Sequence, residues 1–153
     1  GDEGEQIVYE YEKKRVASFN QRLANKVLSL GKTRGLGYDI QSVIAEPGDM
    51  AEFVKYIEVK STKRLTCPDI NDALWVDTLN ITRNEWVAAQ QHRDFYSIFR
   101  VYFTRDGISM FVLKNPMQKY QDGKLQATPM TYRVDFSNIA VDSVITGLQR
   151  EGA

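Results

Sequence analysis

The segment FYSIFRVYF at positions 95–103 limits the possible folds most, because it is a long run rich in aromatic and β-branched residues. A run of this length and composition predicts a strand in the core of a sheet. The residues Arg-Asp-Gly at 105–107 predict a turn, and ISMFVL at 108–113 predicts the strand that pairs back as a hairpin. The chain is therefore expected to build a sheet around this hairpin.

The periodicity of the remaining chain predicts further helices and strands. A three-to-four spacing of apolar residues predicts a helix from about Glu3 to Asn20. Thr82 followed by Glu85 is a capping box, which predicts a second helix at 82–92. Strands are predicted at 26–30, 38–45, 53–60, 74–81 and 130–136, a loop at 32–37, a turn at 46–49, irregular segments at 61–73 and 119–129, and a short terminal helix at 139–149. The order helix, strands, helix, strands indicates an α/β fold.

Composition limits the functions open to such a fold. The chain has 153 residues, a length that fits one domain, and its 20 basic and 20 acidic residues give a net charge of zero. Affinity for nucleic acid would therefore come from local patches or from other domains. The single cysteine, Cys67, excludes an internal disulfide and a cysteine metal cluster, and it favours a reducing compartment such as the cytoplasm. Charges interrupt every apolar run, so neither a membrane span nor a signal peptide is predicted.

The predicted strand at 53–60 alternates between apolar and charged residues. Successive residues of a strand point to opposite faces. Glu58 and Lys60 therefore share one face, and Ile57 and Val59 face a core on the other. The strand presents a carboxylate and an ammonium group side by side.

Asp39 lies on the strand that we expect to pair with this one as a hairpin. Its neighbours Tyr38 and Ile40 are apolar and should share the core face, so Asp39 should project to the opposite face, close to the charged pair. Magnesium is commonly held by one or two carboxylates together with a substrate phosphate. A nearby lysine can position or deprotonate the attacking water, or stabilise developing negative charge. The grouping is therefore suited to hydrolysis of a phosphodiester bond.

The Glu-x-Lys pattern also has a simpler interpretation. Glu12-Lys13-Lys14 matches it inside the predicted first helix, and alternating charges on a strand most often form a solvated face. The triplet alone favours a solvated face, whereas the Asp39 partner leaves the two interpretations about equally supported.

Five motifs in order extend the comparison beyond this triplet. They are GEQIVYEYE at 4–12, GLGYDIQSV at 35–43, YIEVKST at 56–62, ITRNEW at 81–86 and YSIFRVY at 96–102. In this order and spacing they resemble the C-terminal domain of the plant protein NO VEIN, which also occurs in bacterial restriction, helicase and phage-defence proteins. That family is similar to a branch of the PD-(D/E)xK nuclease superfamily. The resemblance covers roughly residues 4 to 113.

The resemblance implies a role for each residue of the cluster. Asp39 matches the metal-binding aspartate of the superfamily, and Glu58 and Lys60 match its (D/E)xK half. Glu5 is the best match for a glutamate on the first helix, with Glu10 as a poorer substitute. The implied metal is Mg²⁺, for which Mn²⁺ can substitute, and the carbonyl of Val59 would be a further ligand.

The resemblance also implies a fold, an activity and partners. The expected fold is a restriction-endonuclease-like mixed β-sheet flanked by helices, forming one domain over residues 1–153. The expected activity is that of a metal-dependent DNA endonuclease in a bacterial restriction or phage-defence system. Such a domain is expected to be excised from, or partnered with, a larger protein that supplies a helicase, NTPase or DNA-recognition domain, and a homodimer is a further expectation.

Basic and polar residues near the cluster are candidates for nucleic-acid contacts. Lys32, Arg34, Lys63 and Arg64 flank it, and Arg83 and Asn84 stand at a predicted helix start, where backbone donors favour anions. Ordinary surface residues would give the same pattern. A catalytically inactive module that binds nucleic acid or a protein partner is therefore the alternative function, which zero net charge favours slightly, and RNA is an alternative substrate.

Overall fold

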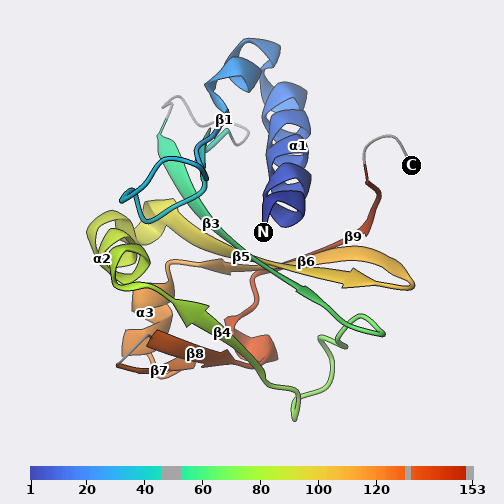
Figure 1. Cartoon of the computed structure of the whole chain (residues 1–153), viewed down its shortest axis with the longest axis vertical. Coiled ribbons are helices and arrows are strands. Elements are labelled where there is room, and N and C mark those ends of the chain that lie inside the picture. Colours follow the sequence, from blue (N-terminus) through green and yellow to red (C-terminus); the bar gives the residue numbers. More distant parts are fainter. Residues whose placement is uncertain (46–52, 130–131, 151–153) are drawn as a thin grey trace.

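The computed structural model describes residues 1–45, 53–129 and 132–150, and their strands form two sheets (Figure 1). The larger sheet contains β1 (Leu28–Ser29), β2 (Ile40–Val43), β3 (Val54–Lys63), β5 (Tyr96–Thr104), β6 (Gly107–Lys114) and β9 (Ser143–Leu148), in that spatial order. β3 and β5 pair in parallel and the other neighbours pair antiparallel, so the sheet is mixed.

A smaller antiparallel sheet and several helices cover the large sheet. The smaller sheet has the order β4 (Asp77–Ile81), β8 (Tyr132–Phe136) and β7 (Leu125–Thr128). The α-helices are α1 (Asp2–Phe19), α2 (Arg83–His92) and α3 (Pro116–Gln121), and the 3₁₀ helices are η1 (Gln21–Lys26), η2 (Arg93–Phe95) and η3 (Asn138–Ala140). This arrangement confirms the expected α/β fold with a mixed sheet flanked by helices. None of the helices in the described ranges is long and apolar enough to cross a membrane.

The core consists of two apolar clusters on opposite faces of the large sheet. All of β5 except its last residue is buried, which explains why apolar residues occupy both faces of this strand. Phe99 and Val101 face the cluster under α1, whereas Ile98 and Tyr102 face the cluster under α2, α3 and the smaller sheet. Figure 1 shows α1 on one side of the large sheet and these other elements on the opposite side. Each fully buried large side chain contributes roughly 1.5–3 kcal/mol.

The strongest local patterns are confirmed. β5 and β6 form the predicted hairpin, and α1 and α2 occupy the predicted helical segments to within a residue or two. The Thr82 hydroxyl accepts a hydrogen bond from the Glu85 N–H, and the Glu85 carboxylate accepts one from the Thr82 N–H, so both halves of the capping box are present. β2 and β3 pair as expected, with Ile40 opposite Ile57. The turn predicted at 46–49 lies outside the described residues.

Several predicted boundaries and elements are wrong. The strand predicted at 26–30 is limited to the two residues of β1, and the one at 74–81 begins only at Asp77. Residues 61–63 were predicted to be irregular, but they continue β3 because the parallel register with β5 extends to Lys63 opposite Phe103. The segment 119–129 was predicted to be irregular, but it contains the end of α3, which begins with the Asn115 cap and Pro116, and the whole of β7.

The last element differs most from its prediction. The segment predicted as a terminal helix at 139–149 forms the short helix η3 and then β9, which pairs with β6. Val144, Ile145 and Thr146 are β-branched, and the outer edge of β6 offers unpaired main-chain groups. Pairing with β6 therefore makes residues 143–148 a strand and not a helix.

Gly37 lies in the loop before β2 and packs closely against α2. We expect Gly37→Ala to destabilise the fold by roughly 3 kcal/mol. Its φ is +78°, and a Cβ there would collide with the main-chain carbonyl of Asn84. Gly35→Ala is the matched control: the φ of Gly35 is +82°, but a Cβ there would meet no atom within 4 Å. We expect this control to cost about 1 kcal/mol, from backbone strain alone. Urea unfolding measures both, and equal losses would contradict the close packing at Gly37.

Candidate functional site

A polar cleft of about 500 Å³ lies beside the second half of β3. Its described lining is Gly1 and Glu5 at the start of α1, Asp39 before β2, Glu58 to Thr62 of β3, Thr78 to Asn80 of β4, and Arg100 of β5. The structure thus places Asp39 beside Glu58 and Lys60, as strand pairing predicts, and brings Glu5, which only the family resemblance implies, to the same cleft. Residues separated by as many as 99 positions in the chain, Gly1 and Arg100, meet here.

Asp39 is fixed against β3 by two hydrogen bonds. Its main-chain N–H donates to the carbonyl of Ile57 at 2.8 Å, and its Oδ2 accepts from the N–H of Val59 at 2.9 Å. These contacts hold the carboxyl group beside Glu58, close enough for its negative charge to raise the pKa of that acid. The side-chain hydrogen bond orients the carboxylate before any ligand arrives.

The expected reason for the position of Asp39 is wrong, although the position itself agrees. Tyr38 and Ile40 were expected to share one core face. Ile40 packs in the cluster under α1, whereas Tyr38 packs in the opposite cluster, with its ring 4.8 Å from that of Tyr56. The chain bends at Asp39, before β2 begins at Ile40, so strand alternation does not extend back to Tyr38.

Glu58 is a buried acid with little compensating charge. Its exposed fraction is 4%. Burial, followed by the negative charges of Asp39 and Glu85, raises the pKa of Glu58 to about 9, and the positive charge of Lys60 opposes this shift only in part. As predicted, the flanking Ile57 and Val59 face the apolar cluster under α1. A cation bound beside Glu58 would therefore relieve an existing electrostatic cost.

Lys60 lies between two acids. Its Nζ is 2.7 Å from Glu85 Oε1 and 3.6 Å from Glu58 Oε1. Burial lowers the pKa of Lys60, but the hydrogen bond to Glu85 and the charge of Glu58 outweigh burial and hold the pKa above its usual value. Lys60 is therefore an ammonium ion at neutral pH. From the sequence, Glu85 was assigned only to the capping box, although it belongs to the ITRNEW motif, the one signal that pointed to it.

Glu5 reaches the cleft from the first turns of α1. Its carboxylate lies against Gly31, where any side chain would collide with it. Burial, followed by the charges of Asp39 and Asp2, raises the pKa of Glu5. Glu10, the poorer substitute, does not line the cleft; its carboxylate accepts a hydrogen bond from Gln6 at 2.9 Å on another side of α1.

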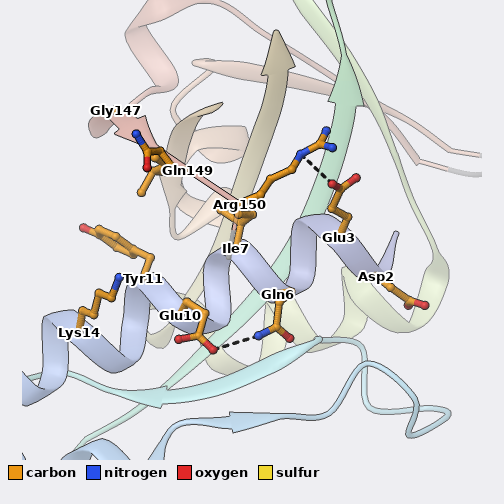
Figure 2. A pocket seen from close by; sticks show the side chains of 11 residues that line it. Asp2, Glu3, Gln6, Ile7, Glu10, Tyr11, Lys14, Gly147, Gln149 and Arg150 are labelled. Atoms are coloured by element: carbon orange, nitrogen blue, oxygen red, sulfur yellow. Dashed lines mark hydrogen bonds and ion pairs between the residues drawn. The ribbon is translucent and has the colours of Figure 1, made fainter. Parts of the chain in front are cut away.

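That other side of α1 borders a cavity of about 600 Å³, which is larger than the polar cleft (Figure 2). It lies between α1 and the end of β9, and Figure 2 shows the ion pair between Glu3 and Arg150 that crosses it, at 2.8 Å. Ile7 and Leu148 contribute apolar walls. Glu10 lines this cavity, but Glu5, Asp39, Glu58 and Lys60 do not, so size alone does not locate the candidate site.

The candidate nucleic-acid contacts have different surroundings. Lys32 lines a cavity of about 320 Å³ that shares Glu5 with the cleft. Lys63 is exposed at the end of β3, and Arg34, Arg83 and Asn84 are also exposed. Arg64 instead forms an ion pair with Asp77 at 3.2 Å, so one nitrogen of the Arg64 guanidinium group is already engaged.

A buried network supports the floor of the cleft and was not predicted from the sequence. Arg100 lies opposite Lys60 in the β3–β5 register, and its Nε donates to Asp77 Oδ2 at 2.8 Å. The Tyr102 hydroxyl donates to the same oxygen at 2.6 Å. Burial raises the pKa of Asp77, but hydrogen bonds from Arg100 and Tyr102 outweigh it and hold the pKa below its usual value. The network fixes β4 against β5.

The donor set fits magnesium better than a metal that requires a complete protein cage. Within residues 1–45, 53–129 and 132–150, no group of three or more His, Cys, Asp or Glu side chains is arranged to hold a metal ion. Asp39 and Glu58 lie in direct contact, and Glu5 lines the same cleft close enough for the charge of Asp39 to raise its pKa. Magnesium retains several waters and commonly takes only one or two carboxylates.

Comparison with known proteins supplies one match. No curated protein and no solved structure shows significant similarity to the chain. A family described as "Protein NO VEIN, C-terminal" matches residues 4–113, which is well over half of the sequence and includes every residue of the Asp39, Glu58 and Lys60 cluster. The chain therefore belongs to the NO VEIN C-terminal domain family.

Proposed function

We propose that this domain is a metal-dependent DNA endonuclease of the PD-(D/E)xK type. The observation that carries the proposal is the pairing of Asp39 with the buried, electrostatically strained Glu58, within one polar cleft that also holds the ammonium of Lys60. The order of these residues in the chain, and the resemblance of the family to that superfamily, support the same conclusion.

Each residue has a distinct function in this proposal. Asp39 and Glu58 would hold Mg²⁺ or Mn²⁺ together with the Val59 carbonyl, and Glu5 would contribute through water. When bound, the ion lowers the pKa of a coordinated water and offsets phosphate charge. Because the pKa of Lys60 is raised, its side chain stabilises negative charge on the phosphate rather than removing a proton from water.

The proposal also includes the residues that would contact DNA and the domain that would deliver it. Lys32, Arg34, Lys63, Arg83 and Asn84 would contact phosphates on either side of the cleft, with Arg64 contributing the part of its guanidinium that Asp77 leaves free. Zero net charge limits what this rim can bind alone. A helicase, NTPase or DNA-recognition domain in the same or a partner chain would deliver DNA, as in a restriction or phage-defence system.

A second candidate function is a non-catalytic module that binds nucleic acid or a protein partner. The specific observation in its favour is the zero net charge of the chain, which gives the domain no general attraction to DNA and suits a module that works beside a partner domain. The two functions differ in what they require of Asp39. An endonuclease needs its carboxylate for the metal, whereas a binding module needs it only for the hydrogen bond to Val59.

A combined binding and cleavage experiment tests the proposal. We expect the wild-type protein to bind Mn²⁺ in calorimetry and to cleave plasmid or single-stranded DNA, and we expect Asp39→Asn to weaken Mn²⁺ binding by at least about tenfold and to stop cleavage. Asp106→Asn, in the exposed turn between β5 and β6, is the control for loss of one carboxylate. Absence of both Mn²⁺ binding and cleavage in the wild type would support the binding module, and RNA substrates test the alternative polymer.

A further inference from the structure

Glu85 has two functions in the structure, although its sequence context indicates only one. The same atom, Oε1, accepts a hydrogen bond from the Thr82 N–H at 3.1 Å and another from Lys60 Nζ at 2.7 Å. Its side chain is 12% exposed, so water competes little for these contacts. The capping box of α2 therefore includes a direct ionic contact with the candidate catalytic lysine.

Lys60 is not shared equally between its acidic neighbours. The contact with Glu85 is a short charge-assisted hydrogen bond, whereas the separation of 3.6 Å from Glu58 Oε1 is too long for one. Without the charge of Glu85, the nearest acid for the ammonium group would be Glu58, which lies beside Asp39. The ammonium would then occupy the place beside the two acids that a divalent cation needs.

We propose that Glu85 is a positioning residue that holds the ammonium of Lys60 away from the Asp39–Glu58 pair, which leaves that pair free for a divalent cation. This inference rests on the proposed function, because it assigns a task within the same cleft. It also connects the first turn of α2, where Arg83 and Asn84 are exposed, to the position of Lys60.

The surroundings of Glu85 suit a positioning residue. It stands on the first turn of α2, whose Trp86, Ala88 and Ala89 are buried in the core. The close approach of Gly37 to the Asn84 carbonyl packs the loop before Asp39 against the same turn. Glu85 therefore acts from a rigid element, and little side-chain freedom remains to be lost when it holds Lys60.

A double-mutant cycle on Mn²⁺ affinity tests this function. We expect Glu85→Gln, which keeps the shape of the side chain, to weaken Mn²⁺ binding in calorimetry by about tenfold. In a Lys60→Met background no ammonium can move onto Glu58, so adding Glu85→Gln should change the affinity by less than about twofold. Equal weakening in both backgrounds would overturn the proposal, because the effect would then come from the charge of Glu85 itself. An unchanged affinity in Glu85→Gln would also overturn it.

A second readout does not depend on the metal. In protein labelled with ¹⁵N-lysine, we expect the Lys60 ammonium to give a signal protected from hydrogen exchange in the wild type and in Thr82→Ala, but not in Glu85→Gln. Thr82→Ala is the matched control because it removes the other half of the capping box and leaves the contact with Lys60 in place. Loss of the signal in Thr82→Ala, or its survival in Glu85→Gln, would overturn the proposal. If the wild type binds no Mn²⁺ but shows this pattern, the metal site fails and the positioning of Lys60 stands.

Discussion

Lys60→Met is expected to slow cleavage of a phosphodiester bond about a thousandfold while Mn²⁺ affinity stays at least as high as in the wild type. The ammonium is held at neutral pH by its contacts with Glu85 and Glu58, so it can stabilise negative charge that develops on the phosphate. Its removal also leaves no cation to compete with the metal for Glu58. Single-turnover cleavage at saturating Mn²⁺ measures the chemical step, and calorimetry measures binding.

The control for this variant is Lys124→Met. Lys124 is exposed in the turn before β7 and does not line the cleft, so we expect its loss to leave the cleavage rate within about twofold. Wild-type cleavage by Lys60→Met would exclude Lys60 from the reaction. A loss of Mn²⁺ binding in parallel with cleavage would show that Lys60 supports the site rather than the chemistry.

Glu58→Gln is expected to stabilise the metal-free protein in alkaline solution and to remove its Mn²⁺ binding. The pKa of Glu58 is raised from 4.5 to about 9, so the folded state retains a proton that the unfolded state releases. The stability that depends on this proton is fully present below pH 4.5 and is lost as the pH rises to about 9. Glutamine resembles the protonated acid and should abolish this loss, which we expect to be on the order of 3 kcal/mol.

Metal binding should show the opposite pH dependence. A bound Mn²⁺ requires the ionised carboxylate, so binding releases a proton and the wild-type affinity should rise by up to about tenfold per pH unit below the pKa of Glu58. Urea unfolding across this range, with and without Mn²⁺, measures both effects. Glu10→Gln is the control, because Glu10 lies on α1 outside the cleft. If Glu58→Gln and the wild type lose stability in parallel as the pH rises, Glu58 is not the group responsible.

Some elements were predictable because their signals are local. The β5–β6 hairpin follows from an apolar run, a turn and a second apolar run in direct succession. The start of α2 follows from the spacing of Thr82 and Glu85. Glu58 and Lys60 share a face because alternate residues of any strand point to the same side.

Other elements were not predictable because a distant partner decides them. Residues 143–148 read equally well as helix or strand over so short a length, and the open edge of β6 selects the strand. Residues 61–63 look like the start of a loop, but pairing with β5 extends β3 through them. Asp39 lies beside Glu58 because the chain bends there and its carboxylate accepts a hydrogen bond from Val59, whereas strand alternation does not extend to it.

The central hairpin, the start of α2 and the common face of Glu58 and Lys60 follow from residues within a few positions of each other. The arrival of Glu5 and Arg100 at the same cleft, and the closer contact of Lys60 with Glu85 than with Glu58, depend on the folding of distant segments onto β3. The raised pKa of Glu58 also depends on the tertiary structure, because Glu58 is buried and lies near the charges of Asp39 and Glu85 only in the folded chain. A local pattern specifies where a side chain points, whereas its solvent exposure and charged neighbours depend on segments far away in the sequence.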